Sequence, residues 1–153
     1  MNLDSLNNWL MLAANIGVIG GIIFLAFEVR QNNLMMRSQT RSDISQNISN
    51  MLMQWGDSEY VDLTLLDINL ADLDTEEFRR VFFFYTAQFR TWENIHYQYR
   101  NGLYDESEFT KEREVWRQTM NTDATKAMFC RDAHVYSDEF VNEMYLLMEA
   151  PCN

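Results

Sequence analysis

The chain of 153 residues carries 23 acidic and 12 basic side chains, which gives a formal net charge of −11. This balance argues against nucleic acid as a partner, because binding to a phosphate backbone needs clustered lysine and arginine. One proline and five glycines leave few residues that break helices, and no strand-like alternation of useful length appears. Composition therefore predicts an all-α fold.

Residues 9–27 form an apolar stretch without one charged side chain. As a helix this stretch covers roughly 28 Å, close to the ~30 Å hydrocarbon thickness of a bilayer. A cleaved signal peptide fits poorly, because residues 1–8 contain no lysine or arginine and no A-x-A triplet follows. A buried helix of a soluble protein would usually be shorter or show a polar face. The sequence predicts a transmembrane helix over residues 9–29, preceded by a short exported tail of residues 1–8.

Basic residues near this span predict its orientation. Arg30, Arg37 and Arg41 follow the span, and no basic side chain precedes it. By the positive-inside rule the N-terminus is outside and the C-terminal domain is cytoplasmic, in a single-pass protein of the bacterial inner membrane. Cys130 and Cys152 have no metal-binding spacing, and we expect free thiols in a reducing compartment. A disulfide between them would instead indicate the reverse orientation.

Small residues recur within the span at Ala13, Gly17 and Gly21, with Gly20 beside them. Small residues four apart let two helix backbones approach closely in lipid. Asn15 is a lone amide in an apolar stretch, and such a group usually hydrogen-bonds to a neighbouring helix. These five residues predict a helix-association face, and the alternative is an anchor that faces only lipid.

The polar stretch of residues 31–46 predicts a stalk that continues directly from the span. An apolar stripe at helical spacing then predicts an amphipathic helix; its members are Ile44, Ile48, Met51, Leu52 and Trp55. We therefore divide the rest of the chain into a stalk and amphipathic helix over residues 30–56 and one helical domain over residues 57–153.

Local signals predict the longest helix of this domain over residues 75–100. Asp74 followed by Glu77 is the pattern of a capping box, and Asn101 with Gly102 is a stop signal. The remaining expected elements are, in chain order, a short helix or turn-rich segment over 57–73, a helix from Asp105 with Glu108 to about 119, a short helix over 122–133, and a last helix from Ser137 to about 149.

An aromatic seam runs along the 75–100 helix with alternating spacings of four and three residues. Its members are Phe78, Phe82, Tyr85, Phe89, Trp92, His96 and Tyr99. The apolar residues expected to face it are Phe109, Val115, Trp116 and Met120, and then Phe140, Val141, Met144, Tyr145 and Met148. Aromatic stripes of this kind form a hydrophobic core more often than a cofactor site. We interpret the seam as the core of a small helical bundle, and we expect no cofactor.

Glu93 and His96 form the one pattern typical of a metal site. A Glu-x-x-His pair places a carboxylate and an imidazole on one helix face, as in ferritin-like di-iron proteins, but those sites need a second pair and two further glutamates. The only other histidine is His134, and Arg131 lies three residues before it. Glu93 and His96 are therefore weak candidates for metal ligands, and a hydrogen-bonded core histidine is the favoured interpretation of His96.

Residues 57–77 hold eight acidic side chains and no basic one. They are Asp57, Glu59, Asp62, Asp67, Asp72, Asp74, Glu76 and Glu77. Their spacing does not match a calcium-binding EF-hand loop. The favoured interpretation is a solvated face with helix-capping charges, and the alternative is a docking patch for a basic partner.

Three segments carry a resemblance to known proteins, namely FEVRQNN at 27–33, ENIHYQYRNGLYDE at 93–106 and YSDEFVNEMYLLME at 136–149. They resemble a group of small uncharacterised bacterial membrane proteins, in which an N-terminal span runs into an R-Q-N stretch and a helical domain with an E-N-x-x-x-Q-Y-x-x-G segment. The resemblance implies bacterial origin and inner-membrane placement, and it implies no catalytic role for any residue.

These patterns favour a non-enzymatic, single-span inner-membrane protein. It would act as a scaffold or accessory subunit of a membrane assembly, or form its own oligomer through the transmembrane helix, with membrane lipid and other membrane-protein subunits as partners. One alternative is a membrane-anchored sensor or small-ligand-binding helical domain. A third, less favoured, is a metal-dependent enzyme that uses Glu93 and His96.

Overall fold

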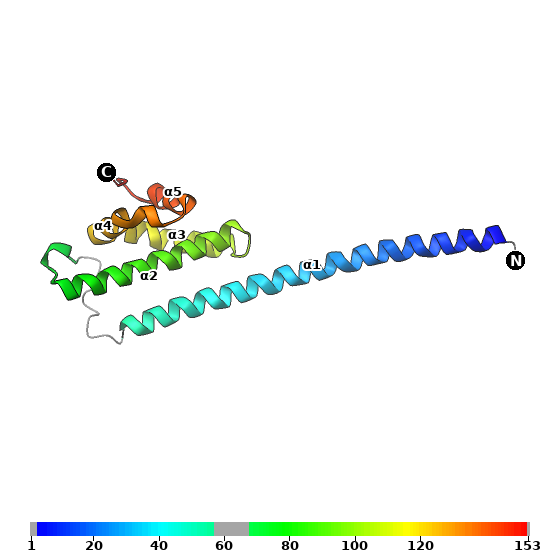
Figure 1. The fold of residues 1–153 in the computed structure, drawn as a ribbon, viewed down its shortest axis with the longest axis horizontal. Helices are drawn as coiled ribbons and strands as arrows, with labels where there is room; N and C mark the ends of the chain where they lie inside the picture. The colour runs from blue at the N-terminus through cyan, green and yellow to red at the C-terminus, as the bar shows by residue number, and fades with distance from the viewer. Residues whose placement is uncertain (1–2, 57–67, 153) are drawn as a thin grey trace. The chain divides into compact units, whose positions relative to one another are not determined.

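The computed structural model describes residues 3–56 and 68–152, which form helices and short connections without a strand. The predicted all-α fold is confirmed: a long apolar N-terminal helix is followed by a helical bundle (Figure 1). The elements are the α-helices α1 (Leu3–Gly56), α2 (Thr75–Arg100), α3 (Glu106–Met120), α4 (Asp123–Asp132) and α5 (Asp138–Leu147), with 3₁₀ turns η2 (Leu70–Asp72) and η3 (Ala133–Val135).

Two compact units divide the chain. The first is Met1–Gln39, whose described part is the N-terminal portion of α1. The second is Thr40–Asn153, which we call the helical domain; it contains the C-terminal portion of α1 and every later element.

Local signals set the ends of α2 as the sequence predicts. The side chain of Asp74 accepts hydrogen bonds from the backbone N–H groups of Glu76 and Glu77, and the Glu77 carboxylate accepts from the Asp74 N–H at 2.8 Å. This reciprocal capping box satisfies backbone donors that the first turn leaves unpaired. Asn101 is the C-terminal cap, and Gly102 has a φ of 71°, a left-handed conformation that glycine adopts without steric cost.

The later helices begin where polar side chains were expected to cap them, but with different hydrogen bonds. Asp105 accepts from the Ser107 N–H at 2.8 Å at the start of α3. Ser137 is the N-cap of α5, yet its side chain makes no capping bond to that helix. Instead its backbone N–H donates to the Glu93 carboxylate of α2 at 2.7 Å. The start of α5 is therefore fixed by a neighbouring helix.

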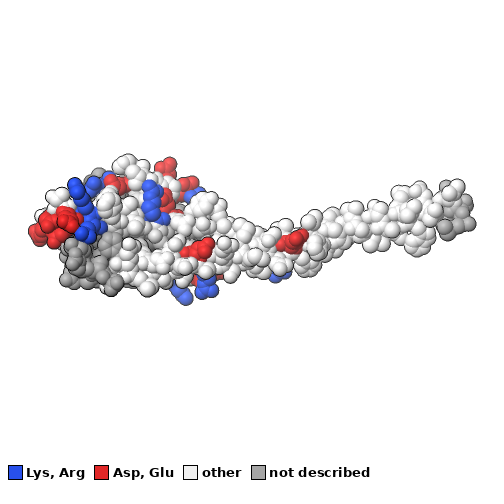
Figure 2. All heavy atoms as spheres, turned by 60° about the horizontal axis from the view of Figure 1, so that its bottom comes forward, with Lys and Arg blue, Asp and Glu red and all other residues white. Residues whose placement is uncertain are grey.

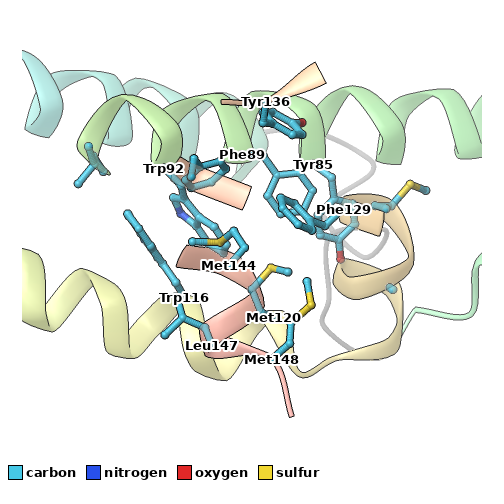
Figure 3. Close-up of a cluster of buried hydrophobic side chains, with 14 of the residues drawn as sticks. Tyr85, Phe89, Trp92, Trp116, Met120, Phe129, Tyr136, Met144, Leu147 and Met148 are labelled. Carbon is cyan, nitrogen blue, oxygen red and sulfur yellow. The ribbon is translucent and has the colours of Figure 1, made fainter. Parts of the chain in front are cut away.

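The predicted aromatic seam forms the core of the helical domain (Figure 3). Tyr85, Phe89 and Trp92 of α2 are buried. The Phe89 ring lies 5.3 Å from that of Phe129 in an edge-to-face arrangement, and Trp92 stacks on Trp116, also at 5.3 Å between ring centres. Such pairs add stability beyond their buried area. Phe78, Phe82 and Tyr99 pack against this core as half-buried residues.

One predicted core position is wrong. Val115 is 55% exposed, because the face of α3 that carries Phe109, Trp116 and Met120 is the buried one. Conversely, Leu147 is buried although the expected stripe of α5 did not include it.

The C-terminal portion of α1 joins the helical domain through one face. Ile44 is 4% exposed within the core, Ile48 packs against it, and Arg41 pairs with Glu108 of α3 at 2.7 Å. Leu52, which the predicted stripe included, is 63% exposed. The side chain of Trp55 lies outside the described residues.

Candidate functional site

The apolar stretch of α1 is exposed along its whole described length. It is the one described helix that is long and apolar enough to cross a membrane. Trp9, Phe24 and Phe27 are all more than half exposed. Figure 2 shows a long N-terminal part of α1 without a charged side chain on the face in view. Contiguous apolar surface of this extent is rare on a protein that contacts only water, and it marks a membrane or protein interaction site.

The small residues of α1 present an open face. Ala13, Gly17, Gly20 and Gly21 are exposed, and no atom lies within 4 Å of where a Cβ would be placed on any of the three glycines. Residues four apart in a helix lie on one side, so this face is geometrically free to receive another helix. Asn15 is two residues from both Ala13 and Gly17, about 200° around the helix. Its amide therefore points to the side opposite the small residues.

Of the three arginines expected to orient the span, the structure gives an ion pair to one. Arg41 binds Glu108 and belongs to the helical domain. Arg30 and Arg37 belong to the first unit and form no ion pair with another described residue. Both line a shallow groove of about 350 Å³ along α1, whose other lining residues are Ala26, Val29, Asn33 and Leu34.

Glu93 ties three elements together. Its carboxylate accepts from the Arg90 guanidinium at 2.7 Å and from the Ser137 N–H at 2.7 Å. Arg90 in turn donates to the Val135 carbonyl and lies over the Tyr136 ring. Burial acts to raise the pKa of Glu93, but the hydrogen bonds from Ser137 and Arg90 outweigh it and lower that pKa. These contacts give Glu93 a structural task at the start of α5.

His96 lies in the core as the sequence favoured. It is 6% exposed, and the ring centres of Phe109 and Phe140 are each 6.0 Å from its own. Burial lowers the pKa of His96, against the opposing charge of Glu143. Within residues 3–56 and 68–152, no group of three histidine, cysteine or acidic side chains comes together to hold a metal ion. The Glu93 and His96 pair therefore stands without further ligands in the described part of the chain.

Four acids of the acidic segment lie among the described residues and are used locally. Asp72 accepts from the Asn69 side chain, Asp74 and Glu77 form the capping box, and Glu76 pairs with Arg80 at 2.6 Å. The segment's other acids, at positions 57–67, lie outside the described residues. Where the structure describes this segment, its charges stabilise helix starts.

The expectation of free thiols is wrong for this structure. Cys130 of α4 and Cys152 of the C-terminal tail form a disulfide, with 5.4 Å between their Cα atoms. The bond connects residues 22 apart in sequence and closes a loop around η3 and α5. Spacing alone did not reveal the pair, because the tail must fold back on α4 to bring them together.

A hollow of about 650 Å³ lies beside η2 and the start of α4. It is lined by residues 68–71, 121–124 and 127. It lies apart from the aromatic rings of the core, which pack against one another. A ligand pocket among those rings, as the sensor hypothesis expected, therefore gains no support.

No protein-family model, curated protein or solved structure matches the chain.

Proposed function

We propose that this protein is a single-span protein of the bacterial inner membrane that works without catalysis. It would act as a scaffold or accessory subunit of a membrane assembly, or as a self-assembling oligomer. The observation that carries this proposal is the exposed apolar stretch of α1 with an open face of small residues. Helices associate in lipid through such faces, because close backbone contact replaces the missing hydrophobic driving force.

Substitutions at the small-residue face test helix association. Gly17→Leu or Gly21→Leu places a large side chain where two backbones would meet, so we expect loss of the oligomer or of partner subunits. Ile23→Leu exchanges one apolar side chain for another of similar volume and should change nothing. Asn15→Leu should have a smaller effect than Gly17→Leu, since interhelical hydrogen bonds in membranes average only about 0.6 kcal/mol. Crosslinking and native mass measurement in mild detergent give the result.

The control in this experiment is the assembled wild-type protein. If Gly17→Leu and Gly21→Leu leave the assembled state unchanged, the span is only an anchor, and association must be sought in the helical domain. If the wild-type protein co-purifies with nothing and is monomeric, the scaffold proposal fails altogether.

We infer that the N-terminus is outside and the helical domain is cytoplasmic. Arg30 and Arg37 support this orientation, because basic residues beside a span remain on the cytoplasmic side. The Cys130–Cys152 disulfide favours a second candidate placement, with the helical domain exported, since disulfides persist in oxidising compartments.

Thiol labelling separates the two placements. Cells are lysed in acid to prevent thiol exchange, and the denatured protein is treated with a maleimide of high mass, with and without prior reduction. Two labels without reduction indicate reduced cysteines and a cytoplasmic domain. Labelling only after reduction indicates an exported domain, in which case the orientation inferred from the arginines is wrong.

A further inference from the structure

The stretch of α1 between Glu28 and Asp43 carries charge of only one sign. Its three charged residues are Arg30, Arg37 and Arg41, and it contains no acid. Because Arg41 is paired with Glu108, the basic residues without an ion-pair partner in the described structure are Arg30 and Arg37. Both belong to the same unit as the apolar stretch.

Helix geometry places Arg30 and Arg37 on one side of α1. Seven residues turn the helix by about 700°, so the two side chains lie about 20° apart around the axis and about 10 Å apart along it. Glu28, two residues before Arg30, lies about 160° away around the axis. Its carboxylate is therefore on the opposite side of the helix and does not neutralise this pair.

The groove between these arginines is amphipathic along the helix. Ala26 and Val29 line its end toward the apolar stretch, and Arg30, Asn33 and Arg37 provide donors along the rest. The small side chain of Ala26 leaves room for an apolar chain to lie against the helix. A guanidinium binds phosphate oxygens through two parallel hydrogen bonds, which makes arginine well suited to a phosphate group.

The depth of the pair in the bilayer fits a lipid headgroup. Arg30 is three residues beyond Phe27, about 4.5 Å along the axis, and Arg37 is about 15 Å beyond it. The headgroup layer extends roughly 5–8 Å beyond the hydrocarbon on each side. Arg30 would lie in this layer, and the long side chain of Arg37 can extend back toward it, as arginines do at helix ends.

We propose that Arg30 and Arg37 form a binding site for an anionic phospholipid. Its phosphate is held by the two guanidinium groups, and its acyl chain lies along Ala26 and Val29. Charge complementarity identifies this occupant, because a groove with two unpaired cations next to an apolar surface matches a negatively charged headgroup attached to hydrocarbon. The inference depends on the proposed function, since it requires α1 to span the membrane.

Full-length protein in mild neutral detergent provides the test, because it removes any effect of the arginines on orientation. Fluorescent phosphatidylglycerol is titrated against the wild type, Arg30→Gln/Arg37→Gln, and a control of equal charge change, Arg79→Gln/Lys126→Gln, whose two cations lie on the helical domain. One cation near an anionic lipid contributes about fivefold in affinity. We expect the first variant to bind roughly 25-fold more weakly and the control to bind like the wild type.

Three further measurements give each result one meaning. Phosphatidylcholine should bind weakly and equally to all three proteins. Inorganic phosphate in excess should not displace phosphatidylglycerol; full displacement would show that the site binds phosphate rather than lipid and would overturn the proposal. Equal loss of affinity in the two double variants would also overturn it, because only net charge would then matter.

Extraction of membranes with alkaline carbonate separates this inference from the function on which it rests. If the wild-type protein is released from the membrane, α1 does not span it, and the proposed function and the lipid site fail together. If the wild type and Arg30→Gln/Arg37→Gln both stay in the membrane while their lipid affinities are the same, only the lipid site fails.

Discussion

His96 shows how burial changes the chemistry of one residue. Burial among aromatic rings lowers its pKa, so the folded state favours the neutral imidazole. A group whose folded pKa is lowered gives stability that is present above the ordinary value, near 6.5, and is lost as the pH falls through the lowered value. A histidine that held a metal ion would respond to chelators instead.

We expect His96→Phe to flatten the pH dependence of stability below about pH 6.5. The aromatic replacement keeps a ring between Phe109 and Phe140 but removes the titrating group. Urea unfolding of the full chain in detergent, followed by circular dichroism between about pH 5 and 8, measures the slope. His134→Gln is the control, and it should keep the wild-type slope because His96 is unchanged. An identical slope in His96→Phe would contradict a role for this residue in acid sensitivity.

At the scale of the helices, local sequence signals predicted more than tertiary pairing did. The bounds of α2 agree with the expectation because a capping box and an asparagine-glycine stop both act within a few residues. The start of α5 depends on Glu93, which is 44 residues earlier in the chain. No local pattern encodes that contact, nor the pairing of Arg41 with Glu108. The Glu-x-x-His spacing was visible, but whether Glu93 binds metal or a helix start depends on a partner that only the fold brings close.

The capping box of α2 gives a prediction for one helix. Asp74→Ala removes the acceptor for the Glu76 and Glu77 N–H groups, so we expect the free energy of unfolding to fall by about 1 kcal/mol. Thr75→Ala, at the next position and also exposed, is the matched control and should change stability by less than about 0.5 kcal/mol. Equilibrium urea unfolding measures both. Equal stability of Asp74→Ala and Thr75→Ala would mean that the cap does not contribute.

For the whole molecule, the same asymmetry between local and long-range information holds. The all-α class and the apolar N-terminal helix follow from composition and from an uninterrupted apolar stretch, which are properties of the sequence alone. The disulfide was not predicted, because proximity of Cys130 and Cys152 depends on how the tail returns to α4. Its presence also makes orientation a matter for experiment, since thiol state and flanking charge favour opposite sides of the membrane.

Reduction of the disulfide should measurably weaken the helical domain. Closing a loop of this length stabilises a fold by about 3 kcal/mol in the chain-entropy description. We expect a strong reductant to lower the free energy of unfolding of the wild type by about that amount. Cys130→Ser/Cys152→Ser should start at the lower value and show no response to reductant. A wild-type protein equally stable with and without reductant would contradict a stabilising role for the bond.

The bond between Cys130 and Cys152 also changes what the end of the chain is. With the bond intact, a protease that pulls its substrate in from the C-terminus meets a covalently closed loop and must admit two chain segments side by side before α5 unravels. With the bond reduced, the same tail enters as a single thread. The oxidation state of one sulfur pair would then determine whether the protein can be degraded from its C-terminal end, and so how long each molecule survives.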